Sequence, residues 1–320
     1  MKLGAVVVTY NRLVQIEATV ARLLAEPLDV LVVVDNGSTD GSREFLRRLD
    51  DPRLDLIESA ENVGGAGGFE AGLRHVMETH DPDWVVVMDD DARPRPGALA
   101  RFRETAPDAP DVGAVAAAVE NPDGSICEMN RPSLNPFWHG RVLGRAILGL
   151  SRGDKRGFHI PDAAYAPGAG QSEIDVASFV GFFVARRAVA RIGLPDGGYF
   201  IYGDDVTYSL RLRRSGLRIV FDPGLRFAHH CGTLSVDLAT RPLWKVYYLS
   251  RNGVQMTRWA AGWFAPLAFG YYLAVWLRKA RLYEPGERPL YRRLMWRGVR
   301  HGLAGRKGRD ARAHALSGRA

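Results

Sequence analysis

The sequence predicts an α/β fold in which a mainly parallel central sheet is flanked by helices, followed by a helical C-terminal appendage. In the first third of the chain, short apolar runs typical of buried strands alternate with segments that carry apolar residues at helical spacing. Such alternation implies parallel strands joined by crossover helices. In addition, polar residues follow the ends of several predicted strands. Ligands of open α/β sheets bind beyond those carboxyl ends, so we expect the functional site there.

The elements of the first third follow in a regular order. Each predicted strand is too short and too apolar for an amphipathic helix, and turn-rich stretches such as NGSTDGS separate it from the next segment. In chain order, we predict a strand at 3–10, a helix at 13–24, a strand at 30–35, a helix at 41–49, a strand at 53–59, a glycine-rich turn and helix at 62–77, and a strand at 83–91.

The middle of the chain, about residues 112–175, is less regular. It is rich in Gly, Pro and polar residues, which is typical of loops over a site. Order resumes at 174–193 with a strand and a helix, and a further helix is predicted from Asp204. Residues 217–233 then read as a strand and turn that carry the adjacent His229 and His230.

Bulk composition indicates an ordinary globular protein. The 320 residues are 46% hydrophobic and 25% charged, without an internal repeat or a linker-like break. We therefore expect one α/β domain at 1–240 and an appendage at 241–320. The start of the chain has no pattern of a secretory signal, and only two cysteines, Cys127 and Cys231, are present. Both features fit a reducing compartment rather than a disulfide framework.

The positive charge is confined to the C-terminal tail. Residues 276–320 carry 13 Lys and Arg against 3 Asp and Glu, a net charge of +10, whereas the first 275 residues carry −3. Just before this tail, residues 259–277 form a 19-residue apolar run with aromatic residues. The combination favours association of 259–320 with an anionic membrane surface, in an interfacial rather than spanning mode. A buried helical hairpin or a dimer contact is the alternative, and no recognised nucleic-acid-binding motif accompanies the charge.

Three consecutive carboxylates, Asp89 to Asp91, follow the fourth predicted strand. Their mutual repulsion is costly unless a cation lies among them; the alternative is a solvated acidic loop. With a distant imidazole from His229 or, second, His230, an Asp-x-Asp pattern supplies oxygen and nitrogen ligands suited to Mn²⁺ or Mg²⁺. A zinc site lacks cysteine ligands and spaced histidines here.

Other polar segments have both structural and functional interpretations. Asp204 and Asp205 begin a predicted helix, where the helix dipole favours carboxylates, but they also suit a general base. Asp35 is either an acceptor for a nucleotide or the cap of the following turn. The glycines of GGAGGF at 64–69 either approach a diphosphate or form a tight turn, and they match neither the dinucleotide-binding nor the P-loop pattern.

Taken together, these segments resemble inverting glycosyltransferases of family 2, which adopt the GT-A fold. The resemblance covers about residues 5–259 and rests on VVTYNR, VVDNGSTDGS, NVGGAGGF, MDDDARP, the segment from VASFVGFF to YFIYGDDVTYSLRL, and HHCGT. Within the family the chain is most similar to bacterial galactofuranosyltransferases that act on lipid-linked acceptors. Rhamnosyltransferases of the family share many of these sequence motifs. Two departures bear on the sugar: the acidic pair is Asp-Asp rather than Glu-Asp, and Gly203 stands before it where a Trp is common.

The resemblance implies a role for individual residues. Residues 1–111 would bind the nucleotide and 112–240 the acceptor. Asp204 and Asp205 would supply the catalytic base, with the choice between them open. A divalent cation, Mn²⁺ or Mg²⁺, would be held by Asp89, Asp91 and His229. The nucleotide sugar would be bound by Thr9, Asn11, Arg12, Asp35, Asn62, Gly64, Gly65, Asp89 and Asp90.

The implied reaction moves a sugar, galactofuranose from UDP-galactofuranose, to a hydroxyl of a lipid-linked or polysaccharide acceptor in cell-envelope glycan synthesis. The enzyme would work in the cytoplasm, peripherally on the inner face of the cell membrane, with oligomerisation left open. Rhamnosyl transfer from dTDP-rhamnose is the main alternative. A nucleotidyltransferase would normally show a basic, glycine-rich loop after the first strand, which VVTYNRLVQIE lacks. A non-catalytic membrane-binding scaffold would not need the acidic residues.

Overall fold

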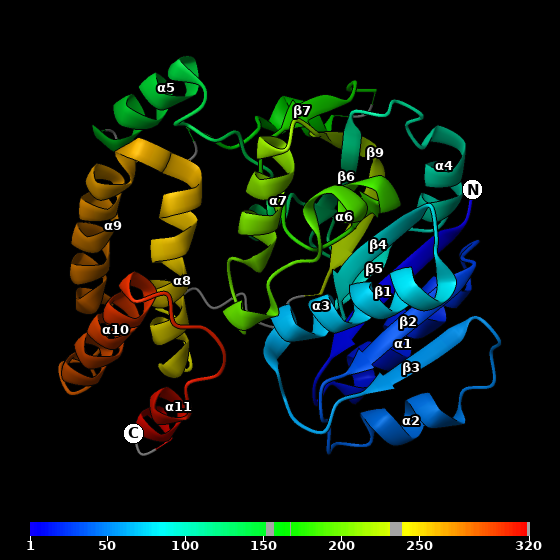
Figure 1. The fold of residues 1–320 in the computed structure, drawn as a ribbon, viewed down its shortest axis with the longest axis horizontal. Helices are drawn as coiled ribbons and strands as arrows, with labels where there is room; N and C mark the ends of the chain where they lie inside the picture. Colours follow the sequence, from blue (N-terminus) through cyan, green and yellow to red (C-terminus); the bar gives the residue numbers. More distant parts are fainter. Residues whose placement is uncertain (152–156, 167, 231–238, 319–320) are drawn as a thin grey trace.

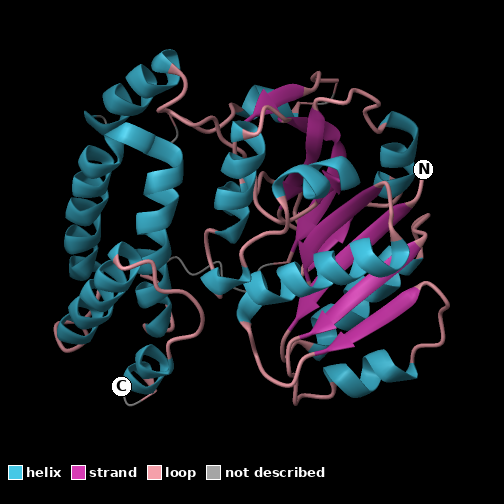
Figure 2. Cartoon of the chain, viewed as in Figure 1, coloured by secondary structure: helices cyan, strands magenta, loops and turns pink. Residues whose placement is uncertain are grey.

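The computed structural model describes residues 1–151, 157–166, 168–230 and 239–318 (Figure 1). The strands of these residues gather into one curled sheet, and most of the C-terminal helices stand apart from it as a second block (Figure 2). The sheet has nine strands among the described residues, in the order β3-β2-β1-β4-β8-β6-β9-β5, with β7 also paired to β9. The α/β fold class predicted from the sequence is thus confirmed.

The N-terminal part of the sheet is parallel, as predicted. It consists of β1 (Leu3–Thr9), β2 (Val30–Asp35), β3 (Leu54–Glu58) and β4 (Trp84–Asp89). Strand β1 lies between β2 and β4, and its register pairs Thr9 with Asp35 and Val8 with Asp89. The polar ends of three neighbouring strands therefore meet at one edge of the sheet.

The other half of the sheet is mixed, because β8 runs antiparallel to both β4 and β6. The remaining strands are β5 (Ala92–Pro94), β6 (Val112–Glu120), β7 (Ser172–Ile174), β8 (Phe182–Ala185) and β9 (Arg218–His229). Strand β6 lies in the stretch that the sequence suggested to be irregular, yet it is buried along its whole length. Its GAVAAAVE sequence is dominated by alanine, which has low β propensity. The local sequence pattern therefore did not indicate a strand here.

Helices connect and cover the strands. Helix α3 lies close to the sheet because Gly68 and Gly72 face the side chains of Val8 and Val6, where a Cβ atom would meet them at 2.4 and 2.5 Å. In the sheet domain the helices are α1 (Leu13–Leu24), α2 (Ser42–Arg48), α3 (Gly64–His75), the π-helical turn η1 (Val76–His80), α4 (Ala98–Thr105), α6 (Arg186–Ile192) and α7 (Asp204–Arg214). Helix α5 (Gly140–Ser151) lies beside the C-terminal helices (Figure 1).

The C-terminal region contains α8 (Trp244–Ala261), α9 (Ala265–Lys279), α10 (Arg288–Leu303) and α11 (Ala311–Ser317). These helices share a second hydrophobic cluster with Phe200, which joins them to the sheet domain. The apolar run at 259–277 is not one straight helix: the turn Gly262–Phe264 separates α8 from α9. The two helices form a hairpin in which Trp276 packs against Gly253.

Candidate active site

The strand-tip cluster lies where β1 and β4 end. Thr9 donates a hydrogen bond from its hydroxyl to Asp90 Oδ2 at 2.7 Å. Arg12, in the loop after β1, donates from Nη1 to Asp90 Oδ1 at 3.3 Å and to Asp91 Oδ2. The expected residues Thr9, Arg12, Asp90 and Asp91 are therefore brought together, and part of the compensating positive charge is Arg12 itself.

The three carboxylates have different environments. The guanidinium of Arg12 and the imidazole of His229 outweigh burial and lower the pKa of Asp91 to about 2. Burial raises the pKa of Asp90 to about 6, against the opposing effect of Thr9 and Arg12. The Asp89 side chain has no hydrogen-bond or ion-pair partner among the described residues, and burial together with the charges of Asp91 and Asp90 raises its pKa to about 7. Asp89 is thus the carboxylate that most lacks positive charge.

His229, the last residue of β9, connects this cluster to the other half of the sheet. Its Nε2 lies 3.1 Å from Asp91 Oδ1, and its Nδ1 lies 2.7 Å from Asn130 Oδ1. The hydrogen bonds with Asp91 and Cys127 and the carboxylate charges raise the pKa of His229 to about 10 despite its burial. His230 instead meets Asp91 through its backbone, whose N–H donates to the Asp91 carbonyl at 2.7 Å. The imidazole that lies against the carboxylate is that of His229.

The chemistry of the expected ligand residues would suit a divalent cation. Asp91 and His229 lie together, and with Asp89 they would offer the carboxylate oxygens and imidazole nitrogen that Mn²⁺ favours and Mg²⁺ tolerates. The poorly compensated Asp89 gains most from such a charge. The hydrogen bond that His229 Nδ1 donates to Asn130 Oδ1 fixes the ring orientation, as outer partners of metal-bound histidines commonly do.

Other residues expected to bind the nucleotide have clear structural contacts. Asp35 is fully buried and accepts hydrogen bonds from the backbone N–H of Ser38 and from Arg43 Nε at 2.7 Å. The turn-capping interpretation therefore describes its contacts. Asn11 lies in the left-handed region at φ 52° and accepts a hydrogen bond from the Thr39 N–H, so it ties the loop after β1 to the loop after β2.

The glycine-rich turn is also built for close packing. Gly64 has φ 79°, and a Cβ atom there would lie 2.0 Å from the Phe200 carbonyl oxygen. Asn62 accepts a hydrogen bond from the Gly64 N–H, and the buried Asn36 donates to the Gly64 carbonyl at 2.8 Å. Gly65, in contrast, has open space where its Cβ would be. Of the two glycines predicted to approach a ligand, only Gly65 borders open space.

The second acidic pair begins α7. Asp204 is buried, and its pKa is raised well above the ordinary value by burial and by the charge of Asp205, with a contribution from Asp89. Asp204 therefore lies within electrostatic reach of Asp89 in the strand-tip cluster. Burial raises the pKa of Asp205 to about 6, although its side chain accepts a hydrogen bond from the Val206 N–H at 2.7 Å. Within the part of the chain that the structure describes, neither carboxylate forms an ion pair with a cationic side chain.

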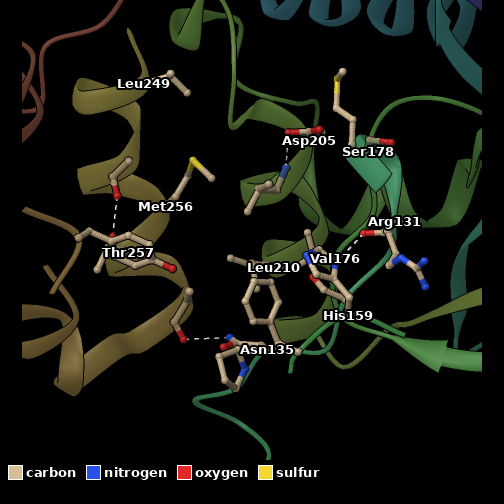
Figure 3. A pocket seen from close by; sticks show the side chains of 18 of the residues that line it. Arg131, Asn135, His159, Val176, Ser178, Asp205, Leu210, Leu249, Met256 and Thr257 are labelled. Atoms are coloured by element: carbon tan, nitrogen blue, oxygen red, sulfur yellow. Dashed lines mark hydrogen bonds between the residues drawn. The ribbon is translucent and has the colours of Figure 1, made fainter. Parts of the chain in front are cut away.

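Asp205 also lines a cavity of about 410 Å³ between the sheet domain and the C-terminal helices. In Figure 3, Asp205 lies between Ser178 on one side and Leu249 and Met256 of α8 on the other. The cavity walls are mostly apolar and come from segments far apart in the sequence. They include Leu134, Phe137, Val176, Leu210, Val246, Leu249, Met256 and Trp276. The cavity thus offers an apolar binding space with one carboxylate at its wall.

Two functional contacts were missed by sequence reasoning. Asn130 belongs to a segment that read as loop, and only the fold brings it to His229. Asn252, buried in the middle of α8, donates from Nδ2 to the carbonyls of Tyr199, Ile201 and Tyr202. Those residues precede Asp204, and Tyr202 has φ 65°. The signal available in the sequence was the polar pair Arg-Asn inside the apolar stretch YYLSRNGVQM.

Known proteins are similar to this chain in sequence and in fold. The family model "Glycosyl transferase family 2" matches residues 5–155. Galactofuranosyltransferase GlfT1 of Mycolicibacterium smegmatis is 28% identical over 233 residues, which cover 72% of this chain and 71% of the relative. The N-acetylglucosaminyl-diphospho-decaprenol L-rhamnosyltransferase of Mycobacterium tuberculosis (strain CDC 1551 / Oshkosh) is 28% identical over 252 residues, covering 71% of this chain and 76% of the relative.

Comparison with solved structures identifies proteins with a similar fold. S. aureus TarS 1-349 in complex with UDP-GlcNAc superposes with a TM-score of 0.56 at 13% identity, covering 99% of this chain and 84% of that one. The mannosyltransferase PcManGT from Pyrobaculum calidifontis, in complex with GDP-Man and Mn²⁺, gives a TM-score of 0.55 at 18% identity and covers 95% and 86%. These likenesses identify the fold as GT-A.

Proposed function

Since residues 5–155 are a family 2 glycosyltransferase domain, we propose that the chain is an inverting, metal-dependent glycosyltransferase that acts on a lipid-linked acceptor. Its donor is UDP-galactofuranose, and the product belongs to cell-envelope glycan synthesis. The observation that carries the proposal is the pairing of two acidic sites. In the strand-tip cluster, Arg12 and His229 lie against Asp91. At the start of α7, Asp204 is within electrostatic reach of Asp89, and the adjacent, partly buried Asp205 lines an apolar cavity.

The α7 pair performs the proton chemistry. The acceptor hydroxyl lies in the cavity beside Asp205 and attacks the anomeric carbon of the donor sugar. A new carbon–oxygen bond forms while the bond to the diphosphate breaks, and Asp205 takes the hydroxyl proton. A pKa near 6 leaves Asp205 mostly ionised at neutral pH yet basic enough to accept that proton. Burial and the charge of Asp205 raise the pKa of Asp204 well above its ordinary value, so Asp204 would be the protonated member of the pair, because two adjacent carboxylates in this setting do not both ionise readily.

The strand-tip cluster binds the leaving group. Asp89, Asp91 and His229 would hold Mn²⁺ or Mg²⁺, which supplies positive charge to the diphosphate. Arg12, about half exposed beside Asp91, extends this positive charge toward solvent. Thr9, Asn11 and Asp35 order the two loops that border the nucleotide, while Gly65 leaves room for the sugar diphosphate at the start of α3.

The identity of the donor sugar needs a separate test. Relatives named as a galactofuranosyltransferase and as a rhamnosyltransferase are both 28% identical to this chain, so rhamnosyl transfer from dTDP-rhamnose is the second candidate. Purified protein should be incubated with a polyprenyl-diphosphate glycan acceptor, Mn²⁺ and each labelled donor in turn. Label transfer from UDP-galactofuranose alone supports the proposal, and transfer from dTDP-rhamnose alone replaces it. NMR of the product tests inversion: retention of the donor's anomeric configuration would exclude the single displacement.

We also propose that the helical hairpin binds the membrane surface that carries the acceptor. One helical stretch among the described residues, Trp244–Leu282, is long and apolar enough to cross a membrane by length and composition. Its bend exposes large apolar side chains: Trp263 is 99% exposed and Leu267 78%. Aromatic and apolar side chains next to a basic tail favour interfacial binding to anionic lipid.

Vesicle sedimentation tests this contact. Replacing Trp263 and Leu267 together by serine should reduce binding to vesicles that contain anionic lipid, while transfer to a soluble acceptor analogue persists. The matched control is Val14→Ser, because Val14 is an isolated apolar residue on α1 that is 74% exposed. Equal vesicle binding by the double variant and the control would contradict the interfacial role.

A further inference from the structure

A second group of ligand-type side chains lies at the opposite end of the sheet from the strand-tip cluster. His75 Nε2 and His80 Nε2 lie 2.6 and 2.7 Å from the same atom, Asp55 Oδ2. Asp55 is near the start of edge strand β3, whereas the proposed active site is at the carboxyl ends of the strands. Each of the three side chains is about a third exposed, so ions in solution can reach them. Neither the proposed transfer reaction nor the sheet core uses this group.

A local irregularity of the backbone brings the two histidines together. His75 ends α3 and His80 ends the π-helical turn η1. In a regular α-helix, residues five apart point about 140° away from each other, at 3.6 residues per turn. A π turn closes with i to i+5 hydrogen bonds, here from the Asp81 N–H to the Val76 carbonyl at 3.1 Å, and so places residues five apart on one side. π turns of this kind are frequent at functional sites.

We propose that Asp55, His75 and His80 bind a divalent transition-metal ion of the Zn²⁺ class, with water completing the coordination. The ligand atoms of the three residues all lie within 4.8 Å of one another. For metal–ligand bonds of about 2.0–2.1 Å, a tetrahedral ion separates its ligands by about 3.3 Å. Each imidazole would therefore need to move about 0.6 Å from the carboxylate, which partly exposed side chains accommodate.

Ligand chemistry separates this site from the strand-tip cluster. Two imidazoles and one carboxylate favour Zn²⁺ and its neighbours over Mg²⁺, whereas the strand-tip set is richer in oxygen. The ion would join the start of β3 to the end of α3, the helix whose other end carries Gly64 and Gly65. Because the ion binds the folded arrangement only, it should stabilise the chain.

The test is a zinc titration of the full-length protein after removal of bound metal with a chelator. Zinc bound per chain is measured by competition with a chromophoric indicator, in the presence of excess Mg²⁺, for the wild type and His80→Ala. We expect His80→Ala to bind one equivalent less than the wild type. The same loss is expected when both proteins also carry Asp91→Ala, which separates this site from the strand-tip cluster.

The matched control is His139→Ala. His139 Nε2 lies 2.7 Å from Asp175 Oδ2, and among the described residues no second imidazole is bonded to this carboxylate. The change should leave the zinc stoichiometry unchanged. If His80→Ala fails to fold, the conservative Asp55→Asn replaces it, and zinc should then raise the melting temperature of the wild type but not of this variant. Equal zinc binding by the wild type, His80→Ala and Asp55→Asn would overturn the proposal.

Discussion

The two acidic clusters of this protein differ in what surrounds them, and the difference supports the separate roles that we propose for them. At the strand tips, Asp91 lies against Arg12 and His229, and its pKa falls to about 2. At the start of α7, Asp205 has no cationic side chain bonded to it among the described residues, and burial raises its pKa to about 6. A carboxylate that stays ionised suits ligand binding, and one with a raised pKa suits proton transfer. Residue type alone does not separate these roles; the neighbouring charges do.

The largest expected effect follows from removing the proposed base. Asp205→Asn keeps the size of the side chain but cannot accept the acceptor proton, so turnover should fall by about 10²- to 10⁴-fold. Radiolabel transfer to a lipid-linked acceptor measures it. Asp108→Asn, an exposed change in the loop before β6, is the control. Turnover within twofold of the control would remove Asp205 from the mechanism and leave Asp204 as the candidate base.

A smaller effect is expected when the strand-tip cluster is weakened. Asp91→Asn removes a charge from the proposed cation site and from the contacts with Arg12 and His229. We expect the Mn²⁺ concentration for half-maximal activity to rise by about 10- to 100-fold. An initial-rate titration with Mn²⁺ measures the shift. An unchanged Mn²⁺ dependence would show that this cluster does not hold the ion.

The α7 pair depends on a contact from the C-terminal helices. Asn252→Ala removes the donor shared by three loop carbonyls before Asp204, so the acidic pair should be less well positioned and kcat should fall by about 10-fold or more. The Mn²⁺ dependence should stay as in the wild type. Gln255→Ala is the control on the same helix, because Gln255 bonds to the Gly302 carbonyl instead. Equal kcat values for the two variants would argue against a positioning role.

The pH dependence of kcat tests the proposed role of Asp205 in the wild-type protein. Below pH 6, protonation removes the basic form of Asp205, so kcat should fall by about 10-fold per pH unit as the pH decreases. Above pH 7 this limb should be flat. A profile of kcat at saturating donor and acceptor from pH 5 to 8 measures it. A constant kcat across this range would contradict a base with a pKa near 6.

Sequence reasoning captured the features set by local pattern. The apolar runs before Thr9, Asp35 and Asp89 predicted three parallel strands and their polar tips, because each run is continuous and ends at a turn signal. It did not capture features that depend on packing. Strand β6 is alanine-rich and takes its conformation from its neighbours, and the contact of Asn130 with His229 joins residues far apart in the chain.

The glycines of α3 show the same limit in another form. The motif GGAGGF suggested either an approach to a diphosphate or a tight turn, whereas its Gly68 lies inside the helix and, together with Gly72, allows α3 to approach β1. Both uses require the absence of a Cβ atom, so the sequence cannot distinguish them. Likewise, the strand-tip carboxylates predicted a cation beside them. In the fold, the guanidinium of Arg12 supplies part of the positive charge that compensates them.

The most direct test of the division between the two acidic clusters is calorimetric titration of UDP, with and without Mn²⁺, into the wild type, Asp91→Asn and Asp205→Asn. We expect Mn²⁺ to strengthen UDP binding to the wild type and to Asp205→Asn equally. Asp91→Asn should lose most of that Mn²⁺-dependent gain. If the two variants weaken Mn²⁺-dependent UDP binding to the same extent, or if Asp205→Asn alone weakens it, the assignment of binding to one cluster and proton transfer to the other is wrong.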